Sequence, residues 1–261
     1  MDIHQILIYD GSFEGLLTAI FEVFEYRFHQ ADIIPRHRSL QEMIFTQTHE
    51  VVTQPDKADR VLKRLEANVG KQGVLAFLAV YLSEKEGVER LILNVVRHSV
   101  RNPNKNILND IAHPDVMEFG KIWKSVFRES HLMKAFVRFE RLQDDFYFAK
   151  IEPDFNVLPL VMNFFKQRYA DQKWMIYDLK RRYAVIYDLS TVDIYYPEED
   201  QTNNFTDSES YHHTQEKGYQ VLWQRYFAKI NIAERKNTPL HTRHMPKRYW
   251  KYLTEKNGLR I

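Results

Sequence analysis

The hydrophobic periodicity of this chain changes near residue 130, and this change limits the folds that it can adopt. Between residues 56 and 100 apolar side chains recur at helical spacing, and the run Val74–Leu82 is apolar all round, as in a helix buried on several sides. His113 and Pro114 open another helix. We therefore expect residues 1–130 to be mostly helical after one N-terminal strand.

Beyond residue 130 the pattern favours strands. Residues 134–142 and 145–153 are two aromatic-rich runs that can form a hairpin. Asn156 can cap the helix that follows, and residues 174–188 read as a second hairpin. The sequence predicts an α+β fold, in which an antiparallel ββαββ unit over residues 131–196 packs with a largely helical layer.

The last part of the chain, residues 208–261, is expected to contain an amphipathic helix and a basic C-terminal helix. The inner stripe of the amphipathic helix is predicted to include Tyr219, Leu222 and Trp223. With these elements, we expect residues 1–261 to form a single compact domain.

Positive charge is concentrated at the C-terminal end. From Arg225 onward there are ten Lys and Arg residues and two Glu residues, a net charge of +8, whereas the whole chain carries only +2. The preceding residues therefore carry −6. Such a basic tail is typical of a segment that binds an acidic partner, although it is also compatible with a solvated helix face.

Composition excludes several classes of site. The chain has no cysteine, which rules out disulfides, thiolate nucleophiles and thiolate metal sites. Its longest apolar run is about half the length of a bilayer crossing, and its N-terminus lacks the pattern of a secretory signal. We expect a cytoplasmic protein without a membrane partner.

The stretch YDGS, Tyr9–Ser12, follows a strand and opens a helix. Backbone N–H groups at such a helix start favour an anion, so Gly11 and Ser12 are candidates for binding a phosphate or a carboxylate. The alternative is that Ser12 simply caps the helix and Gly11 forms the turn.

Acidic residues are the weak candidates for catalysis. Asp10 ends the first strand, and Asp144 and Asp145 lie at the first hairpin beside Glu140. Carboxylates grouped near a lysine can hold a divalent metal for phosphodiester chemistry, but turn acids more often bond their own backbone. The histidines are not at recognisable ligand spacing, and we expect neither a metal nor a cofactor.

Cations interleaved with aromatic residues are the candidates for nucleic-acid binding, because bases stack on rings and phosphates pair with cations. Arg181 and Arg182 lie in such a run at the second hairpin, although aromatic rings in strands can equally be core. The segment RHMPKRYWKYLTE, residues 243–255, contributes the rest: Arg243, His244, Lys247, Arg248, Trp250 and Lys251.

Three stretches carry a resemblance to a known family. They are YDGSFEGLLTAIFEVFEY, FERLQDDFYFAKIEPDFNVLPLVMNFFKQRYADQKWMIYDLKRRYAVIYD and RHMPKRYWKYLTE. In this order they resemble a bacterial family associated with DNA metabolism or DNA repair. Its members are encoded beside a radical-SAM protein, and a similar domain is fused to some uracil-DNA glycosylase-like proteins. The resemblance implies a DNA context and a radical-SAM partner, and it assigns no catalytic residue.

Three functions are compatible with these observations. The first is a nucleic-acid-binding accessory to a radical-SAM DNA repair or modification enzyme, which binds single- or double-stranded DNA without sequence specificity. The second is a DNA-processing enzyme of the nuclease, glycosylase or lyase type that uses the acidic residues. The third is a protein-interaction module for the radical-SAM partner that does not contact DNA.

Overall fold

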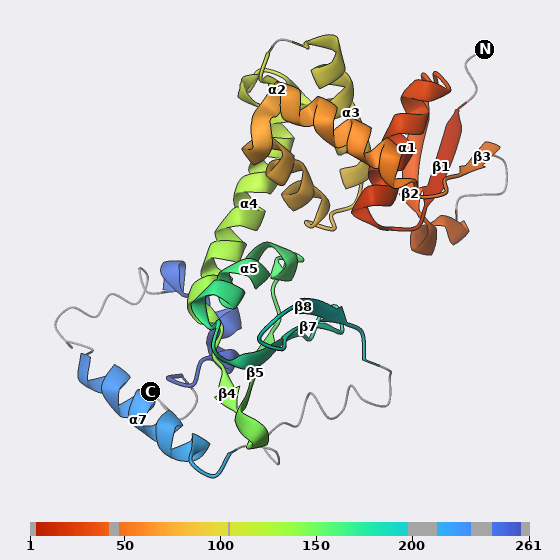
Figure 1. Cartoon of the computed structure of the whole chain (residues 1–261). Helices are drawn as coiled ribbons and strands as arrows, with labels where there is room; N and C mark the ends of the chain where they lie inside the picture. The colour runs from red at the N-terminus through yellow and green to blue at the C-terminus, as the bar shows by residue number, and fades with distance from the viewer. Residues whose placement is uncertain (1–3, 42–46, 104, 198–212, 231–241, 257–261) are drawn as a thin grey trace. The chain divides into compact units, whose positions relative to one another are not determined.

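The computed structural model describes residues 4–41, 47–103, 105–197, 213–230 and 242–256. They belong to two compact units, residues 1–127 and 128–261 (Figure 1). Each unit contains both helices and strands, which confirms the α+β class. The expected single domain stays a prediction.

The first unit contains a small parallel sheet. Its strands are β1 (Gln5–Tyr9), β2 (Ala31–Pro35) and β3 (Gln47–Glu50), in the order β2-β1-β3. The sequence predicted β1 alone. β3 was missed because its sequence, QTHE, is polar and mostly exposed, and therefore lacks an apolar alternation.

Helices make up most of the rest of this unit. They are α1 (Phe13–Glu25), α2 (Pro55–Tyr81), α3 (Val88–Arg101) and the first part of α4 (Pro114–Phe136), which continues into the second unit, with the 3-10 turns η1 (Arg36–Gln41) and η2 (Ile107–Asn109). α1 packs against α2, and α3 packs against α2 and β2. α2 is kinked at Gly70, whose φ of +71° is the left-handed region that glycine adopts readily.

Side chains of the protein itself accept hydrogen bonds from backbone N–H groups at the start of α1. Ser12 is the N-cap, as predicted, and its hydroxyl accepts the N–H of Gly15 at 2.9 Å. The Asp10 carboxylate in turn accepts the Ser12 N–H at 2.8 Å and the Thr53 hydroxyl at 2.8 Å. Burial raises the pKa of Asp10, but these hydrogen bonds outweigh it and hold the pKa below its usual value.

A five-stranded sheet forms the centre of the second unit. Its strands, in spatial order, are β4 (Glu140–Arg141), β5 (Phe146–Ile151), β6 (Lys173–Asp178), β7 (Tyr183–Tyr187) and β8 (Val192–Tyr195). β5 and β6 run parallel, because α5 (Leu158–Arg168) lies between them in the chain. The antiparallel ββαββ sheet is therefore not confirmed: the sheet is mixed.

The first predicted strand of this unit is also much shorter than expected. Lys134 and Phe136 still belong to α4, and only Glu140 and Arg141 pair with β5, across the 3-10 turn η3 (Gln143–Asp145). Nor does Asn156 cap α5: Val157 takes that position, and the Asn156 amide oxygen instead accepts the Tyr183 hydroxyl at 2.6 Å.

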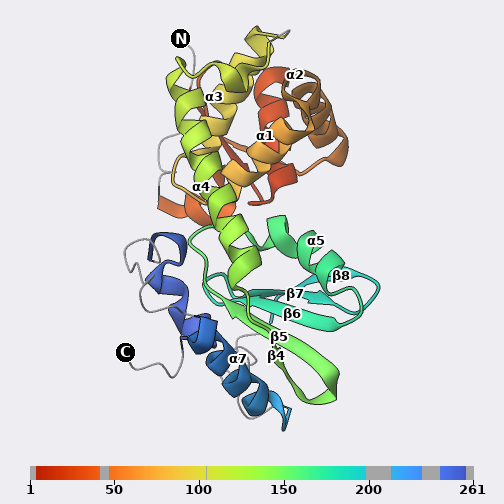
Figure 2. The same ribbon diagram turned by 90° about the vertical axis from the view of Figure 1, so that its left-hand side faces the viewer.

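α5 covers one face of the sheet (Figure 2). Its residues Val161 and Phe165 are buried, as is Trp174 of β6, and the Phe165 and Trp174 rings are in contact. α7 (Glu216–Ile230) lies at the β4 end, because the Glu216 carboxylate accepts the Arg141 backbone N–H at 3.0 Å. The C-terminal helix is a 3-10 helix, η6 (Lys247–Tyr252). None of the helices in the described part of the chain has the length and apolar character that a bilayer crossing requires.

We expect Gly15→Ala to destabilise the first unit by about 2 kcal/mol, because this is the scale on which overpacking acts. An added Cβ at Gly15 would lie 2.2 Å from the Asp10 carboxylate and 2.9 Å from the Thr53 hydroxyl, which are hydrogen-bonded to each other. Urea unfolding measures the loss.

Gly120→Ala is the matched control. Gly120 is also helical, but nothing lies within 4 Å of the position that its Cβ would occupy. Its substitution should stabilise the protein by up to about 1 kcal/mol through helix propensity. Equal and favourable effects of both substitutions would contradict the role assigned to Asp10.

Candidate nucleic-acid interface

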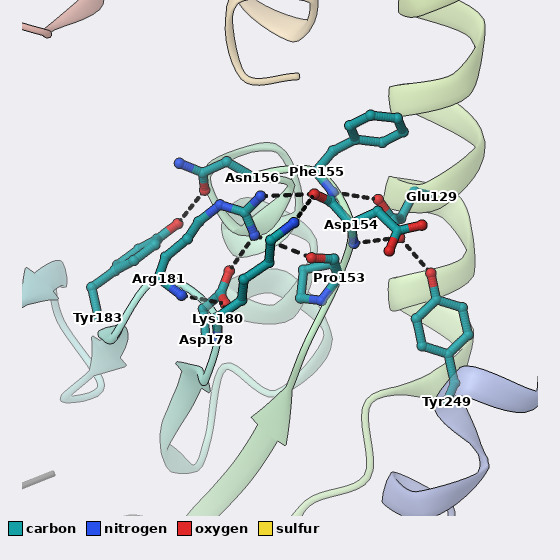
Figure 3. A network of polar contacts seen from close by, with 10 residues as sticks. All are labelled: Glu129, Pro153, Asp154, Phe155, Asn156, Asp178, Lys180, Arg181, Tyr183 and Tyr249. Carbon is teal, nitrogen blue, oxygen red and sulfur yellow. Dashed lines mark hydrogen bonds and ion pairs between the residues drawn. The ribbon is translucent and has the colours of Figure 1, made fainter. Parts of the chain in front are cut away.

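A buried carboxylate organises the polar network of the second unit. Glu129 lies on α4 and is 2% exposed, and it accepts the backbone N–H groups of Asp154 and Phe155 at 2.9 and 2.7 Å (Figure 3). The hydroxyl of Tyr249 and the guanidinium of Arg248 also donate to it. Glu129 thus joins α4, the loop before α5 and the C-terminal segment.

The C-terminal segment is fixed to this network by its cations. The Arg248 guanidinium also pairs with the Asp154 carboxylate at 2.7 Å, and Lys251 pairs with Glu152. Lys251 and Tyr252 lower the pKa of Glu152 by hydrogen bonding. The ion pairs therefore neutralise two of the cations predicted to contact phosphates, Arg248 and Lys251.

Arg181 is likewise engaged inside the protein. Its guanidinium pairs at 3.0 Å with Asp178, whose side chain is completely buried, and donates to the carbonyls of Pro153 and Asp154 at 3.2 and 3.0 Å (Figure 3). Burial raises the pKa of Asp178, and Arg181 opposes that rise. Arg182 is exposed and has a left-handed backbone with a φ of +56°.

The remaining predicted cations of the C-terminal segment are exposed. Within the described residues, Arg243, His244 and Lys247 form no ion pair. The Lys247 ammonium lies 5.9 Å from the centre of the Trp250 ring, and the Trp250 indole donates to the Met245 carbonyl at 3.0 Å.

The structure describes the side chains of two of the three acidic candidates, Asp10 and Asp145, and each is engaged within its own unit. Asp145 is exposed and pairs with Arg141, while the side chain of Asp144 lies outside what the structure describes. Asp10 belongs to the first unit, where it closes the start of α1 together with Gly11 and Ser12. Among the described residues, no three His, Asp or Glu side chains gather as a metal site would require.

Most rings of the second hairpin are core. Trp174, Tyr177 and Tyr183 are at most 5% exposed, so the core alternative applies to them. Tyr169, which ends α5, is only partly buried and contacts the Phe139 ring at 5.2 Å. Tyr169 also lines a groove that we did not predict from the sequence.

This groove has a volume of about 990 Å³, and half of its lining residues are aromatic residues and arginines. Phe139, Tyr147 and Tyr169 come from the sheet side, and Tyr219 and Trp223 come from α7. Tyr219, Leu222 and Trp223 are 54%, 60% and 41% exposed, so the predicted inner stripe of α7 is wrong at these positions. The sequence shows the helical periodicity of α7, but it does not show which face of this helix is exposed to solvent.

Two buried acids hold the groove in shape. Glu216 joins α7 to β4 through the Arg141 backbone. Glu255 joins the C-terminal segment to Arg138 on one side of the groove and to Trp223 of α7 on the other. Glu255 pairs with Arg138 at 2.8 Å and accepts the Trp223 indole N–H at 3.0 Å. Burial raises the pKa of Glu255, but Arg138 outweighs it and holds the pKa below its usual value.

The second unit thus defines a mixed α+β module whose groove is lined by exposed rings. The chain belongs to the family described as a domain of unknown function, DUF4130, whose profile matches residues 86–255. The match includes the Glu129 network and the groove, and it begins after the parallel sheet. No curated protein matches the chain.

We expect Glu129→Gln to lower the free energy of unfolding by about 3 kcal/mol, because it removes the charge from a buried ion pair and places an amide N–H₂ against backbone donors. Glu118→Gln is the control, since Glu118 is half exposed and its ion pair within the described residues is with Lys121 on the same helix. Urea unfolding followed by tryptophan fluorescence compares the two variants. Equal losses would show that the Glu129 network does not fix this unit.

Proposed function

We propose that this protein is a nucleic-acid-binding accessory in DNA metabolism, and that the groove of the second unit binds unpaired bases. The observation that carries this proposal is the set of exposed rings along one groove of about 990 Å³, whose arginines Arg138 and Arg141 are paired with Glu255 and Asp145. The resemblance to a DNA metabolism family supplies the DNA context. Association with a radical-SAM enzyme is part of the same proposal.

Unpaired bases suit the groove because every base offers a flat π face. Tyr219 and Trp223 expose 54% and 41% of their surface, and Tyr147 and Tyr169 line the groove from the sheet side. Stacking on an aromatic ring contributes roughly 1–3 kcal/mol per base without sequence preference. Trp223 is oriented in advance by its hydrogen bond to Glu255, so less side-chain order is lost on binding.

The charges beside the groove favour a phosphate backbone. Over residues 216–225 of α7, the exposed charges are Lys217 and Arg225, while the acid Glu216 is buried. On the sheet side, Arg168 and Lys173 flank the groove residues Tyr169 and Gln172, and Asp171 is the acid among them. Over residues 168–173 and 216–225 the exposed charges are therefore net positive, which matches the charge of a nucleic-acid strand.

Tyr219→Ala should weaken binding of single-stranded DNA about tenfold, which corresponds to the loss of one stacking contact. Fluorescence anisotropy with a labelled mixed-sequence oligonucleotide measures this. Tyr196→Ala is the matched control, because Tyr196 is also an exposed tyrosine of the second unit and does not line the groove. Unchanged affinity of Tyr219→Ala, or tighter binding of the corresponding duplex, would contradict the proposal.

Arg243→Gln with Lys247→Gln tests whether the C-terminal segment contacts phosphates. If each residue neutralises one phosphate, the slope of log K against log salt should become less steep by about 1.4 for single-stranded DNA. Arg248 and Lys251 are left intact, because they pair with Glu129 and Glu152 and their replacement would affect folding as well as binding.

The control is Lys71→Gln with Lys85→Gln, which removes the same charge from exposed positions of the first unit. A slope that falls equally in both double variants would indicate a general effect of net charge and would assign no role to Arg243 and Lys247.

A further inference from the structure

A cationic pocket of about 360 Å³ lies in the first unit, between the end of α1, the loop after it and the last turns of α3. Arg27, Arg97 and Arg101 are its charged lining, His29 is a further polar residue of the lining, and Phe24 and Val100 are part of its apolar wall. Neither the resemblance nor the proposed function makes use of this pocket.

The three arginines form no ion pair. Among the described residues, no carboxylate lies within ion-pair distance of Arg27, Arg97 or Arg101. Asp32 acts on Arg97 at longer range, but its carboxylate is already paired with Arg90, earlier on the same helix α3. Three guanidinium groups that line one pocket without an ion pair repel one another, and this repulsion is relieved when an anion binds.

Arg97 is the fixed member of the group. It is partly buried and donates to the carbonyls of Phe28 and His29 at 3.2 and 3.3 Å. Burial lowers the pKa of Arg97, the charge of Arg101 one turn later lowers it further, and the charge of Asp32 opposes this shift. The guanidinium is therefore held in place by neutral acceptors, which leaves its charge available to a ligand.

Helix ends account for part of this arrangement. Arg97 and Arg101 lie towards the C-terminus of α3, where cations are favoured by the helix dipole. Arg27 follows the C-cap of α1 in a left-handed conformation with a φ of +56°, and the Phe28 N–H bonds the Val23 carbonyl at 2.9 Å, as at many helix ends. The helix ends do not require that all three arginines line one pocket.

A mainly apolar pocket of about 320 Å³, whose lining also includes Arg60 and Arg64, adjoins the cationic one. Phe24 and Val100 line both pockets, and these residues are 40% and 39% exposed. Ile20, Phe21 and Leu65 contribute further apolar surface. A ligand with an anionic group and an attached ring can therefore place the two parts in neighbouring spaces.

We propose that Arg27, Arg97 and Arg101 bind the phosphate group of a nucleotide, whose base or sugar lies in the adjoining apolar pocket against Phe24 and Val100. Guanidinium groups match phosphate oxygens through two parallel N–H donors, and a phosphate monoester carries enough charge to balance most of the cluster. The site belongs to the first unit, so it does not rest on the groove of the second.

The test uses the full chain and isothermal titration with each of the four deoxynucleoside 5′-monophosphates, the corresponding nucleosides and inorganic phosphate at constant ionic strength. We expect at least one monophosphate to bind more tightly than inorganic phosphate, and the nucleosides to bind far more weakly. Arg27→Gln with Arg101→Gln should weaken that binding by at least about tenfold, because it removes two charge-assisted contacts.

Three further variants make the result decisive. Lys71→Gln with Lys85→Gln removes the same net charge and should bind as the wild type does. Arg101→Gln alone keeps the Arg97 contacts to the loop, so its folding is secure, and it should also weaken binding. Tyr219→Ala, in the other unit, should bind the monophosphate normally even if it loses single-stranded DNA. Equal binding by the wild type and the arginine variants, or no binding by the wild type, would overturn the site.

Discussion

The second unit depends on the buried carboxylate of Glu129. A carboxylate that is 2% exposed must be saturated with hydrogen bonds, since an unpaired buried charge is strongly destabilising. Its donors come from the loop at Asp154 and Phe155 and from Tyr249 and Arg248 of the C-terminal segment. Because one acceptor serves all of them, the positions of the loop and of the segment are set together.

Buried carboxylates also connect the elements around the groove. Glu216 and Glu255 are 6% and 1% exposed, and each accepts hydrogen bonds from a different element of the unit. Through them α7, β4 and the C-terminal segment are tied to one another. A groove held by buried ion pairs and hydrogen bonds keeps its shape before a ligand arrives, which lowers the cost of binding. The exposed rings of α7 can remain unburied because these contacts, rather than apolar packing alone, hold the helix.

Local sequence patterns predicted those elements whose determining residues lie close together in the chain. The strand that ends at Tyr9, the N-cap Ser12 and the second hairpin were predicted, since their signals lie within a few residues of the structure that they form. The partners of Arg248 and Lys251 were not predictable in this way. Glu129 precedes Arg248 by 119 positions, and Glu152 precedes Lys251 by 99.

This long-range pairing changes how charge along the sequence should be interpreted. The tail from Arg225 carries +8 by count, yet Arg248 and Lys251 meet acids that the same count assigns to the rest of the chain. Conversely, Arg27 and Arg97 are 70 positions apart and form no noticeable basic run, but they line one pocket. A binding site for an anion is therefore better sought among cations that remain after buried and neighbouring carboxylates have been paired. By that criterion the pocket of the first unit is more strongly cationic than the groove of the second unit, although the arginines of this pocket form no basic run in the sequence.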